Sequence, residues 1–308
     1  MKTISVIVPV YFNEGSLVLL FEELLKVEAQ LAERDCALEL IFVDDGSGDN
    51  SLNVLLSLRE RRPGTKIVKL TRNFGAIHAT KVGLHFVTGD CFMWLAADLQ
   101  DPPHLIVEMV DLWLSGKKYI VATRATRHDP AMSKFYARIY YWLVRLFVIR
   151  DYPRGGFDLI LVDKTLMPYI RDSSKNINTE LLSFWLGVTP VTIPYERQER
   201  QHGKSRWTFA KKLTYFIDSI LGFSVMPIRI ISLIGIVVSL VSFAYGGFIF
   251  LDALFGVRDV PGFPTLVALI SFLLGLIIVM LGIIGEYIWR IFDEVTKRPE
   301  VVVDEVYQ

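Results

Sequence analysis

Roughly the first two thirds of the chain alternate short apolar runs with longer amphipathic stretches. The apolar runs are rich in β-branched residues and are bounded by Gly, Pro, Asn and Asp, as is typical of buried strands. We expect strands at Ile4–Val10, Leu38–Asp44, Lys66–Leu70, Cys91–Ala97, Tyr119–Thr123, Phe157–Val162 and Val188–Tyr195. We expect helices at Ser16–Arg34, Ser51–Arg61, Ala76–Thr88 and Pro103–Ser115. This order predicts an α/β domain with a Rossmann-like, mostly parallel sheet and helices on both faces.

The last third of the chain has a different pattern, because residues 230–251 and 260–285 contain no charged side chain. At about 1.5 Å per residue, each stretch is long enough to cross a hydrocarbon core of about 30 Å. The alternative is a pair of core helices in a soluble protein, which this length and lack of charge disfavour. The outer flanks carry several cations, whereas the loop between the stretches carries one cation, Arg258. The positive-inside rule therefore predicts a hairpin with both flanks in the cytoplasm.

Two further stretches mix aromatic residues with spaced cations, residues 134–150 and residues 206–228. Helices of this kind lie flat at the headgroup boundary of a membrane. For the first stretch, an ordinary helix packed on the sheet is the alternative. We therefore expect a catalytic domain over 1–205, an interfacial helix over 206–228, transmembrane helices at about 230–252 and 262–286 within 229–290, and a cytoplasmic tail over 291–308.

Composition narrows the possible partners and the location. Hydrophobic residues make up 52% of the 308, which is high and agrees with a membrane part. The 33 Lys and Arg balance the 33 Asp and Glu, so no net field favours nucleic acid, and we expect none as a partner. Cys36 and Cys91 lie too far apart for a metal-binding spacing or a disulfide framework. The first nine residues are too short and strand-like for a signal peptide, so we expect the N-terminal domain to stay in the cytosol.

Acidic and amide side chains follow three of the expected strands, in the segments Pro9–Glu14, Asp44–Asp49 and Asp98–Asp101. Because parallel strands end at the same edge of a sheet, these groups converge where α/β sheets bind ligands. Gathered carboxylates need a cation or a hydrogen-bonding ligand to offset their repulsion. A nucleotide sugar fits, with Glu14 or Asp45 facing the base or ribose and Asp98 and Gln100 holding a metal on the pyrophosphate. The alternative is that Asp98 and Asp101 are solvated acids that cap the next helix.

The motifs Pro-Val-Tyr-x-Asn-Glu, Asp-Asp-Gly-Ser-x-Asp and Asp-Leu-Gln-x-Pro-Pro, in this order, resemble glycosyltransferase family 2. With the two apolar C-terminal stretches, the whole chain resembles the polyprenyl-phosphate glycosyltransferases, the group of bactoprenol glucosyltransferases and dolichol-phosphate mannose synthases. The resemblance implies a GT-A fold, an inverting transfer, and Mg²⁺ or Mn²⁺ as cofactor. The family often has Asp-x-Asp before Leu-Gln, whereas Ala96 stands at the first position here, which weakens the expected metal site.

The resemblance extends to three later segments. Arg72–Gly75 is similar to the family's sugar-donor pocket, Gly155–Asp158 to its acceptor side, and the cationic run 196–207 to its phosphate-capturing motif. Surface or loop roles are the alternatives for each. The family resemblance implies that the sugar donor is bound by Pro9, Tyr11, Asn13, Glu14, Asp44, Asp45, Arg72, Gly75 and Asp98. It also implies that the acceptor or phosphate is bound by Arg124, Arg127, Arg197, Arg200, Lys204 and Ser205, that Asp158 and Asp98 are catalytic, and that Asp98 and Gln100 bind the metal.

We therefore expect an integral plasma-membrane enzyme with its catalytic domain and both termini in the cytoplasm. Self-association into a homo-oligomer is compatible with this expectation. The enzyme would transfer a hexose from a nucleotide sugar to undecaprenyl phosphate, with UDP-glucose as the default sugar donor on family prevalence alone. One alternative is a GDP-mannose-dependent polyprenol- or dolichol-phosphate mannose synthase. A processive polysaccharide synthase would need acceptor motifs and additional spans that the sequence lacks. A non-catalytic membrane protein that binds nucleotide sugars is the alternative that Ala96 raises.

Overall fold

A computed structural model describes residues 1–308 apart from 126–130, 151, 154–155, 176, 199–208 and 255–261. Contacts divide the chain into two units. The first contains Met1–Ser219 together with Pro299–Gln308, and the second contains Ile220–Arg298. Each unit is described separately below.

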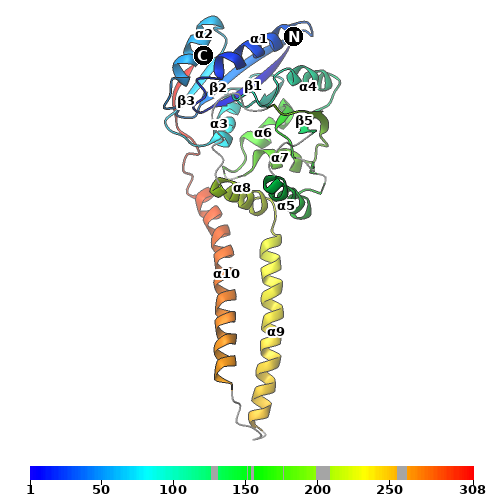
Figure 1. The fold of residues 1–308 in the computed structure, drawn as a ribbon, viewed down its shortest axis with the longest axis vertical. Coiled ribbons are helices and arrows are strands. Elements are labelled where there is room, and N and C mark those ends of the chain that lie inside the picture. Colours follow the sequence, from blue (N-terminus) through cyan, green and yellow to red (C-terminus); the bar gives the residue numbers. More distant parts are fainter. Residues whose placement is uncertain (126–130, 151, 154–155, 176, 199–208, 255–261) are drawn as a thin grey trace. The chain divides into compact units, whose positions relative to one another are not determined.

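The first unit is built on an eight-stranded sheet with the order β7-β5-β6-β4-β1-β2-β3-β8 (Figure 1). Among the described strands, β6 and β8 run opposite to the other six, so the sheet is mixed although most of it is parallel as predicted. The strands are β1 (Lys2–Val10), β2 (Cys36–Asp44), β3 (Lys66–Leu70), β4 (Cys91–Trp94), β5 (Tyr119–Arg124), β6 (Leu159–Asp163), β7 (Val191–Tyr195) and β8 (Val303–Tyr307).

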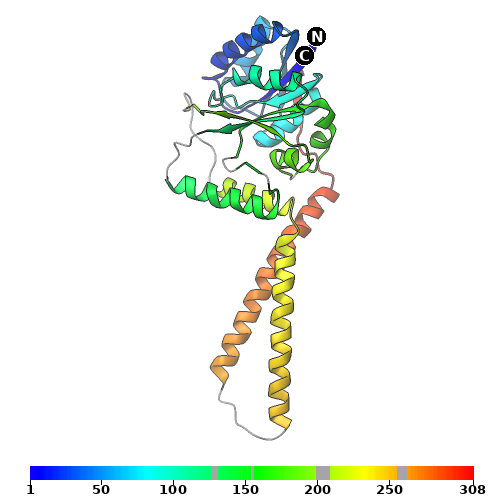
Figure 2. The same cartoon turned by 90° about the vertical axis from the view of Figure 1, so that its right-hand side faces the viewer.

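Helices cover both faces of this sheet (Figures 1 and 2). One group contains α1 (Leu17–Ala32), α2 (Ser51–Arg61) and α4 (Leu105–Leu114), where α1 contacts the other two. The other contains α3 (Ala76–Gly83), α6 (Met167–Arg171) and α7 (Thr179–Trp185), where α6 contacts the other two. The remaining helices of this unit are α5 (Ala131–Phe147) and α8 (Phe209–Leu221).

The central strands have apolar side chains on both faces because helices pack on each. Ile4 and Val6 of β1 are fully buried in the main core cluster. Ile7, whose side chain lies next to Gly83 of α3, is fully buried as well. A Cβ on Gly83 would lie 2.4 Å from Cγ2 of Ile7, so the absence of a side chain at Gly83 lets α3 pack closely on the sheet. Such two-sided burial is why strands in parallel sheets read as continuous apolar runs.

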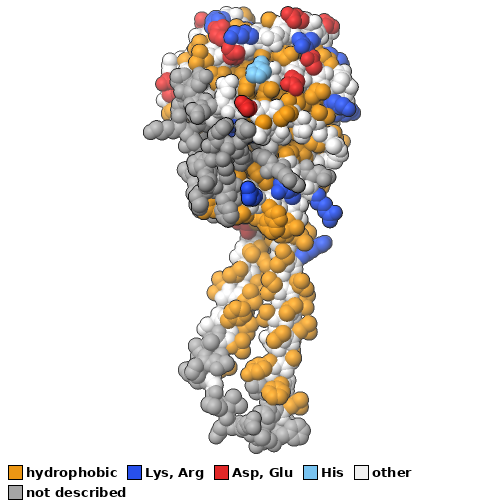
Figure 3. Space-filling model, turned by 45° about the vertical axis from the view of Figure 1, so that its right-hand side comes forward, with side chains coloured by type: hydrophobic (Ala, Val, Ile, Leu, Met, Phe, Trp, Pro, Cys, Tyr) orange, Lys and Arg blue, Asp and Glu red, His pale blue; other side chains and the backbone are white. Residues whose placement is uncertain are grey.

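The second unit consists mainly of α9 (Met226–Leu254) and α10 (Phe263–Val295). Their stretches Met226–Phe248 and Leu269–Val295 are long and apolar enough to cross a membrane, judged by length and composition. Leu240 and Phe243 of α9 and Phe272 and Ile278 of α10 are each more than 60% exposed. The space-filling view in Figure 3 shows apolar side chains along these helices.

The structure differs from the expected elements in several places, including two short helices, α6 and α7, that the sequence pattern did not predict. The helix expected at Ala76–Thr88 ends at Gly83 and is followed by a short 3-10 turn, and β4 ends at Trp94 rather than Ala97. Helix α10 continues to Val295, into the segment expected to be a tail. The same segment contains β8, which pairs antiparallel with the edge strand β3, so residues 303–307 are part of the sheet.

Candidate functional site

The sheet brings predicted site residues from six separate segments of the chain to one edge. The parallel strands β1, β2, β4, β5 and β7 all end there, and β6, which is antiparallel, begins there. The segments that follow or precede these ends contain the predicted Tyr11–Glu14, Asp44–Asp45, Asp98–Gln100, Arg124, Asp158 and Arg197. Ligands of open α/β sheets bind at this kind of edge.

Hydrogen bonds fasten the loop after β1 to the loop after β2. The backbone N–H of Asn13 donates to Ser51 Oγ at 2.9 Å, and the side chain of Asn13 accepts from the N–H of Tyr11 at 2.9 Å. Glu14 accepts from the N–H of Asn50 at 2.9 Å. Phe12, between Tyr11 and Asn13, has a φ of 56°, a backbone conformation that few residues other than glycine adopt. Asn13 and Glu14 therefore set the shape of this part of the edge, whatever they bind.

Asp45 holds the segment that leads into α3. Its two carboxylate oxygens accept from the backbone N–H groups of Phe74 at 2.7 Å and Gly75 at 2.9 Å. These groups lie at the N-terminal end of α3, where negative charge is favourable. Burial raises the pKa of Asp45 above its ordinary value, against these two hydrogen bonds, and burial likewise raises the pKa of Asp44.

The loop Arg72–Gly75 approaches the turn after β2 very closely. A Cβ on Gly46 would lie 2.5–2.8 Å from the backbone of Arg72 and Asn73, and Gly46 has a φ of 66°. Only glycine fits both the contact and the conformation. The guanidinium of Arg72 lies 4.2 Å from the ring centre of Phe74, and the Arg72 side chain is exposed. A cation is thus displayed at the edge beside the two buried aspartates.

The turn after β4 presents Asp98 and Gln100. The N–H of Gln100 donates to Asp98 Oδ1 at 3.2 Å, and Leu99 between them has a φ of 59°. The Gln100 carbonyl accepts from the N–H of Gln198 at 2.9 Å, which joins this turn to the segment after β7. Ser16 Oγ donates to the carbonyl of Ala97 at 2.6 Å and joins the same turn to the start of α1.

The donor set of this turn suits a hard divalent cation. Asp98 supplies carboxylate oxygens and Gln100 an amide oxygen, and both side chains are half-buried rather than sealed off. Among the residues that the structure describes, no three His, Cys, Asp or Glu side chains gather to hold a metal by themselves. Mg²⁺ is commonly held by one or two protein ligands, with phosphate oxygens and water completing its shell. The residues present fit that arrangement.

Four side chains form a hydrogen-bonded cluster next to this turn, which we name the Asp101–Asp158 cluster: Asp101, Arg124, Asp158 and Tyr195. The guanidinium of Arg124 donates two hydrogen bonds of 2.5 Å to the carboxylate of Asp158. The Tyr195 hydroxyl lies 2.6 Å from Asp101 Oδ1 and 2.8 Å from Asp158 Oδ2. Arg197 Nε lies 3.4 Å from Asp101 Oδ1. Two cations and two carboxylates therefore surround one hydroxyl at the edge of the sheet.

The two acids of the cluster have opposite pKa shifts. Burial and the nearby charge of Asp158 raise the pKa of Asp101 to about 6. Burial also disfavours ionised Asp158, but the bonds from Arg124 outweigh it and hold the Asp158 pKa below its ordinary value. One hydroxyl hydrogen cannot be donated to both acids at once. Below about pH 6, a protonated Asp101 can donate to Tyr195 while Tyr195 donates to ionised Asp158, which satisfies all three groups.

The cluster contains two residues to which the sequence analysis assigned no site role. Asp101 is only 3% exposed, so it is not the solvated acid of the alternative interpretation. The sequence feature that could have singled out Asp101 is its place directly before the Pro102–Pro103 pair. Tyr195 is the last residue of an expected strand and has no distinguishing sequence signal. The predicted residues Arg127, Arg200, Lys204 and Ser205 lie outside the described residues.

Comparisons of the sequence with known proteins identify relatives that match nearly the whole chain. An uncharacterized glycosyltransferase of Synechocystis sp. is 34% identical over 99% of this chain and 95% of its own length. A prophage bactoprenol glucosyl transferase homolog of Escherichia coli is 30% identical over 98% of this chain and 99% of its own. The bactoprenol glucosyl transferase of Shigella phage SfII is 29% identical over 99% and 98%.

Solved structures with a similar fold include the glucosyl-3-phosphoglycerate synthase of Mycobacterium tuberculosis in complex with Mn²⁺, UDP and glucosyl-3-phosphoglycerate. It is 15% identical, with a TM-score of 0.48 over 70% of this chain and 76% of that one. The family model described as glycosyl transferase family 2 matches residues 5–177. This match confirms the GT-A fold class expected for the mixed sheet and its helices. The chain belongs to glycosyltransferase family 2 and is a sugar-transferring enzyme.

Proposed function

We propose that this enzyme transfers a hexose from a nucleotide sugar to a polyprenyl phosphate at the cytoplasmic face of the plasma membrane, with inversion at the anomeric carbon. The observation that carries the proposal is the sheet edge, where the Asp98–Gln100 turn lies beside the Asp101–Asp158 cluster and its two neighbouring guanidinium groups, Arg124 and Arg197. Such an edge can hold a metal-bound pyrophosphate and a second phosphate next to each other. Relatives named for bactoprenol glucosyl transfer, which this chain matches over nearly its whole length, support the acceptor class.

In this reaction an oxygen of the acceptor phosphate attacks the anomeric carbon and forms the new C–O bond. The bond from that carbon to the diphosphate oxygen breaks, and the nucleoside diphosphate leaves with the bonding electrons. Asp98 and Gln100 would hold the divalent metal, which when bound neutralises charge developing on the leaving diphosphate. A phosphate acceptor is already ionised near neutral pH, so it needs no strong base.

The Asp101–Asp158 cluster positions cations for the phosphate groups. Asp158 occupies Nε and one terminal nitrogen of Arg124, and the guanidinium has five N–H donors in all. Arg124 can therefore meet a phosphate while Asp158 fixes its orientation. Arg197, tied loosely to Asp101 at 3.4 Å, is the second cation of this set. Asp158 is accordingly a positioning group for Arg124 in this proposal rather than a proton acceptor.

Membrane attachment is supported by α9 and α10 and by the surface of α5. Tyr136, Ile139, Trp142 and Leu146 of α5 are 38–57% exposed and recur at the spacing of one helix face. A helix with this face lies flat in the headgroup region of a bilayer. The acceptor headgroup would then reach the site sideways, without leaving the membrane. The cations that flank the apolar helices favour the cytoplasmic side for the catalytic unit.

Ala96 favours a second candidate, a protein that binds nucleotide sugars without transferring them. This residue is half-buried two positions before Asp98, where the family often has another acid. The two candidates share a nucleotide site and differ only in turnover. A GDP-mannose-dependent transfer differs from the UDP-glucose default in the sugar donor alone.

The test is transfer of radiolabelled sugar from a panel of nucleotide sugars to undecaprenyl phosphate, by the full chain in detergent, with Mg²⁺, Mn²⁺ or EDTA. We expect lipid labelling from one sugar donor that EDTA abolishes. Asp98→Asn should reduce the labelling strongly, whereas the exposed control Asp35→Asn should not. Nucleotide binding without labelling from any sugar donor would favour the non-catalytic candidate. Loss of both would overturn the proposed function.

A further inference from the structure

The segment that follows α10 belongs to the catalytic unit and contacts the chain before and after the loop Arg72–Gly75, which we name the donor-side loop. Before this loop, the N–H of Thr71 donates to the carbonyl of Val302 at 3.1 Å. After it, α3 begins at Ala76, and two of its side chains contact Glu300. The donor-side loop is therefore bracketed by residues 300–302, more than two hundred positions away in the sequence.

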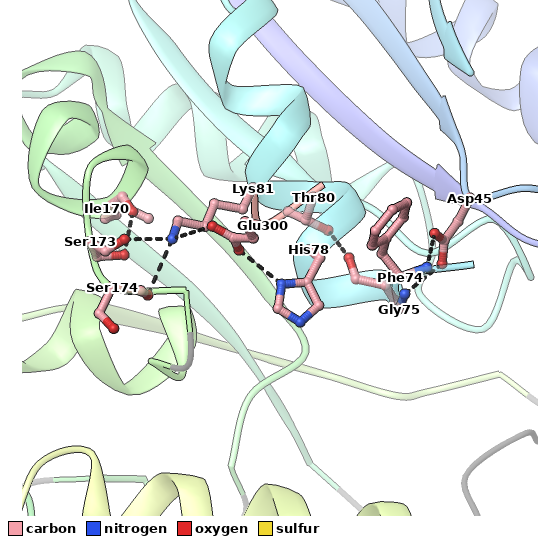
Figure 4. Close-up of polar contacts among 11 residues, drawn as sticks. Asp45, Phe74, Gly75, His78, Thr80, Lys81, Ile170, Ser173, Ser174 and Glu300 are labelled. Carbon is pink, nitrogen blue, oxygen red and sulfur yellow. Dashed lines mark hydrogen bonds and ion pairs between the residues drawn. The ribbon is translucent and has the colours of Figure 1, made fainter. Parts of the chain in front are cut away.

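Glu300 joins two side chains of α3 (Figure 4). Its Oε1 lies 2.8 Å from Nδ1 of His78, and its Oε2 accepts from Nζ of Lys81 at 2.9 Å. The Lys81 ammonium also donates to the carbonyls of Ser173 at 2.6 Å and Ser174 at 3.2 Å. Lys81 is only 5% exposed, and a buried ammonium needs such partners.

The opposite end of α3 is fixed at the sugar-donor edge. The N–H groups of Phe74 and Gly75 donate to Asp45, and the N–H of Ala79 donates to the carbonyl of Gly75 at 3.0 Å, which begins the helix. Figure 4 shows Asp45 beside the residues that lead into α3 and Glu300 alongside the same short helix, between His78 and Lys81. A shift of α3 at Lys81 therefore moves the N–H groups that Asp45 holds.

We propose that Glu300 is a positioning residue for the sugar-donor site: it fixes α3, and through α3 the donor-side loop, in the geometry that binds the nucleotide. This inference rests on the proposed function, because it takes the donor-side loop as part of the nucleotide site. No residue of the segment 300–302 needs to touch the nucleotide. The charge of Glu300 matters because it neutralises the buried Lys81, and Pro299–Gln308 belongs to the catalytic unit by its contacts.

The experiment compares Glu300→Gln with the matched control Glu305→Gln in the full chain in detergent. Glu305 lies in β8, is 52% exposed, and faces Lys69 rather than α3. Titration with UDP and with GDP, each with Mn²⁺, measures nucleotide affinity, and hydrogen exchange without nucleotide measures how firmly the donor-side loop is held. For Glu300→Gln we expect faster exchange at residues 73–79 and a nucleotide Kd weaker on the order of tenfold, as for the loss of a charge-assisted hydrogen bond. The transfer rate at saturating sugar donor should change little.

Unchanged exchange at residues 73–79 would overturn the inference, and so would faster exchange with an unchanged nucleotide Kd. A wild-type protein that binds neither nucleotide would overturn the proposed function instead, and exchange alone would then show whether Glu300 holds the loop. Protection of the β1 and β2 amides reports whether the variant is folded. If Glu300→Gln loses that protection, His78→Ala, which removes one of the two contacts, replaces it in both measurements.

Discussion

Replacing Arg124 by Met removes the guanidinium that grips Asp158 while keeping most of the side-chain volume. The two side chains are 17% and 16% exposed and are joined by two hydrogen bonds of 2.5 Å. Removing one partner of a buried pair costs about 3–5 kcal/mol, because the other charge stays buried without compensation. The residual exposure favours the lower end of that range. A domain of roughly 150–250 residues loses about 2–4 °C of Tm per kcal/mol, so we expect Arg124→Met to lower Tm by about 6–12 °C.

Thermal melting followed by tryptophan fluorescence, with all variants in the same detergent, measures this effect. Adding Asp158→Asn to Arg124→Met removes the uncompensated charge, so the double variant should melt above Arg124→Met. Arg171→Met is the matched control, because its pair with Asp172 is 34% and 57% exposed and solvent-exposed pairs contribute little to stability. A melt of Arg124→Met that coincides with the wild type, or a double variant that melts no higher than the single one, would contradict this expectation.

Three further predictions concern the site and the opposite edge of the sheet. Gly46→Ala should displace Arg72 and weaken nucleotide binding by on the order of tenfold or more in a titration, whereas Gly64→Ala, with nothing within 4 Å, should not. Burial raises the pKa of Glu39, but hydrogen bonds from its Lys, Ser and Thr partners outweigh burial and hold it below the ordinary value. Ionised Glu39 therefore stabilises the fold at pH values above the ordinary Glu pKa, and this stabilisation is lost as pH falls through the lowered pKa. In thermal melts across pH, Glu39→Gln should lower Tm near neutrality and make Tm fall less steeply at acid pH. Ala96→Asp should lower the Mn²⁺ concentration needed for half-maximal transfer, and an unchanged or higher requirement would count against a metal at this turn.

The sequence predicted the central strands well because their physical cause is local. Strand β1 and strand β2 are buried on both faces, so their apolar runs need no knowledge of their neighbours to be recognised. Strand β8 depends on a neighbour: its residues Val303–Tyr307 are short, partly acidic and mostly exposed, and they become a strand by pairing with β3. A pairing across more than two hundred residues leaves no periodic signal.

The candidate site divides in the same way. The acids at strand ends were predictable because parallel topology alone brings Asp45 and Asp98 to one edge. The hydroxyl of Tyr195 was not, because its role arises only when β7 lies beside β5 and sets it between Asp101 and Asp158. Strand order within a sheet depends on crossovers that local patterns do not encode. For the same reason, no local pattern indicated that Glu300 contacts α3.

The position of β8 in the chain has a consequence for biosynthesis. During translation, β1 to β7 leave the ribosome first, then the two long apolar helices, and the residues of β8 only afterwards. Until then β3 is an edge strand with one side unpaired, and exposed edges invite pairing with other chains. Completion of the catalytic sheet thus has to wait until the apolar helices have been synthesised. A nascent chain stalled before residue 300 would carry an open edge at β3, which is prone to pairing with other chains.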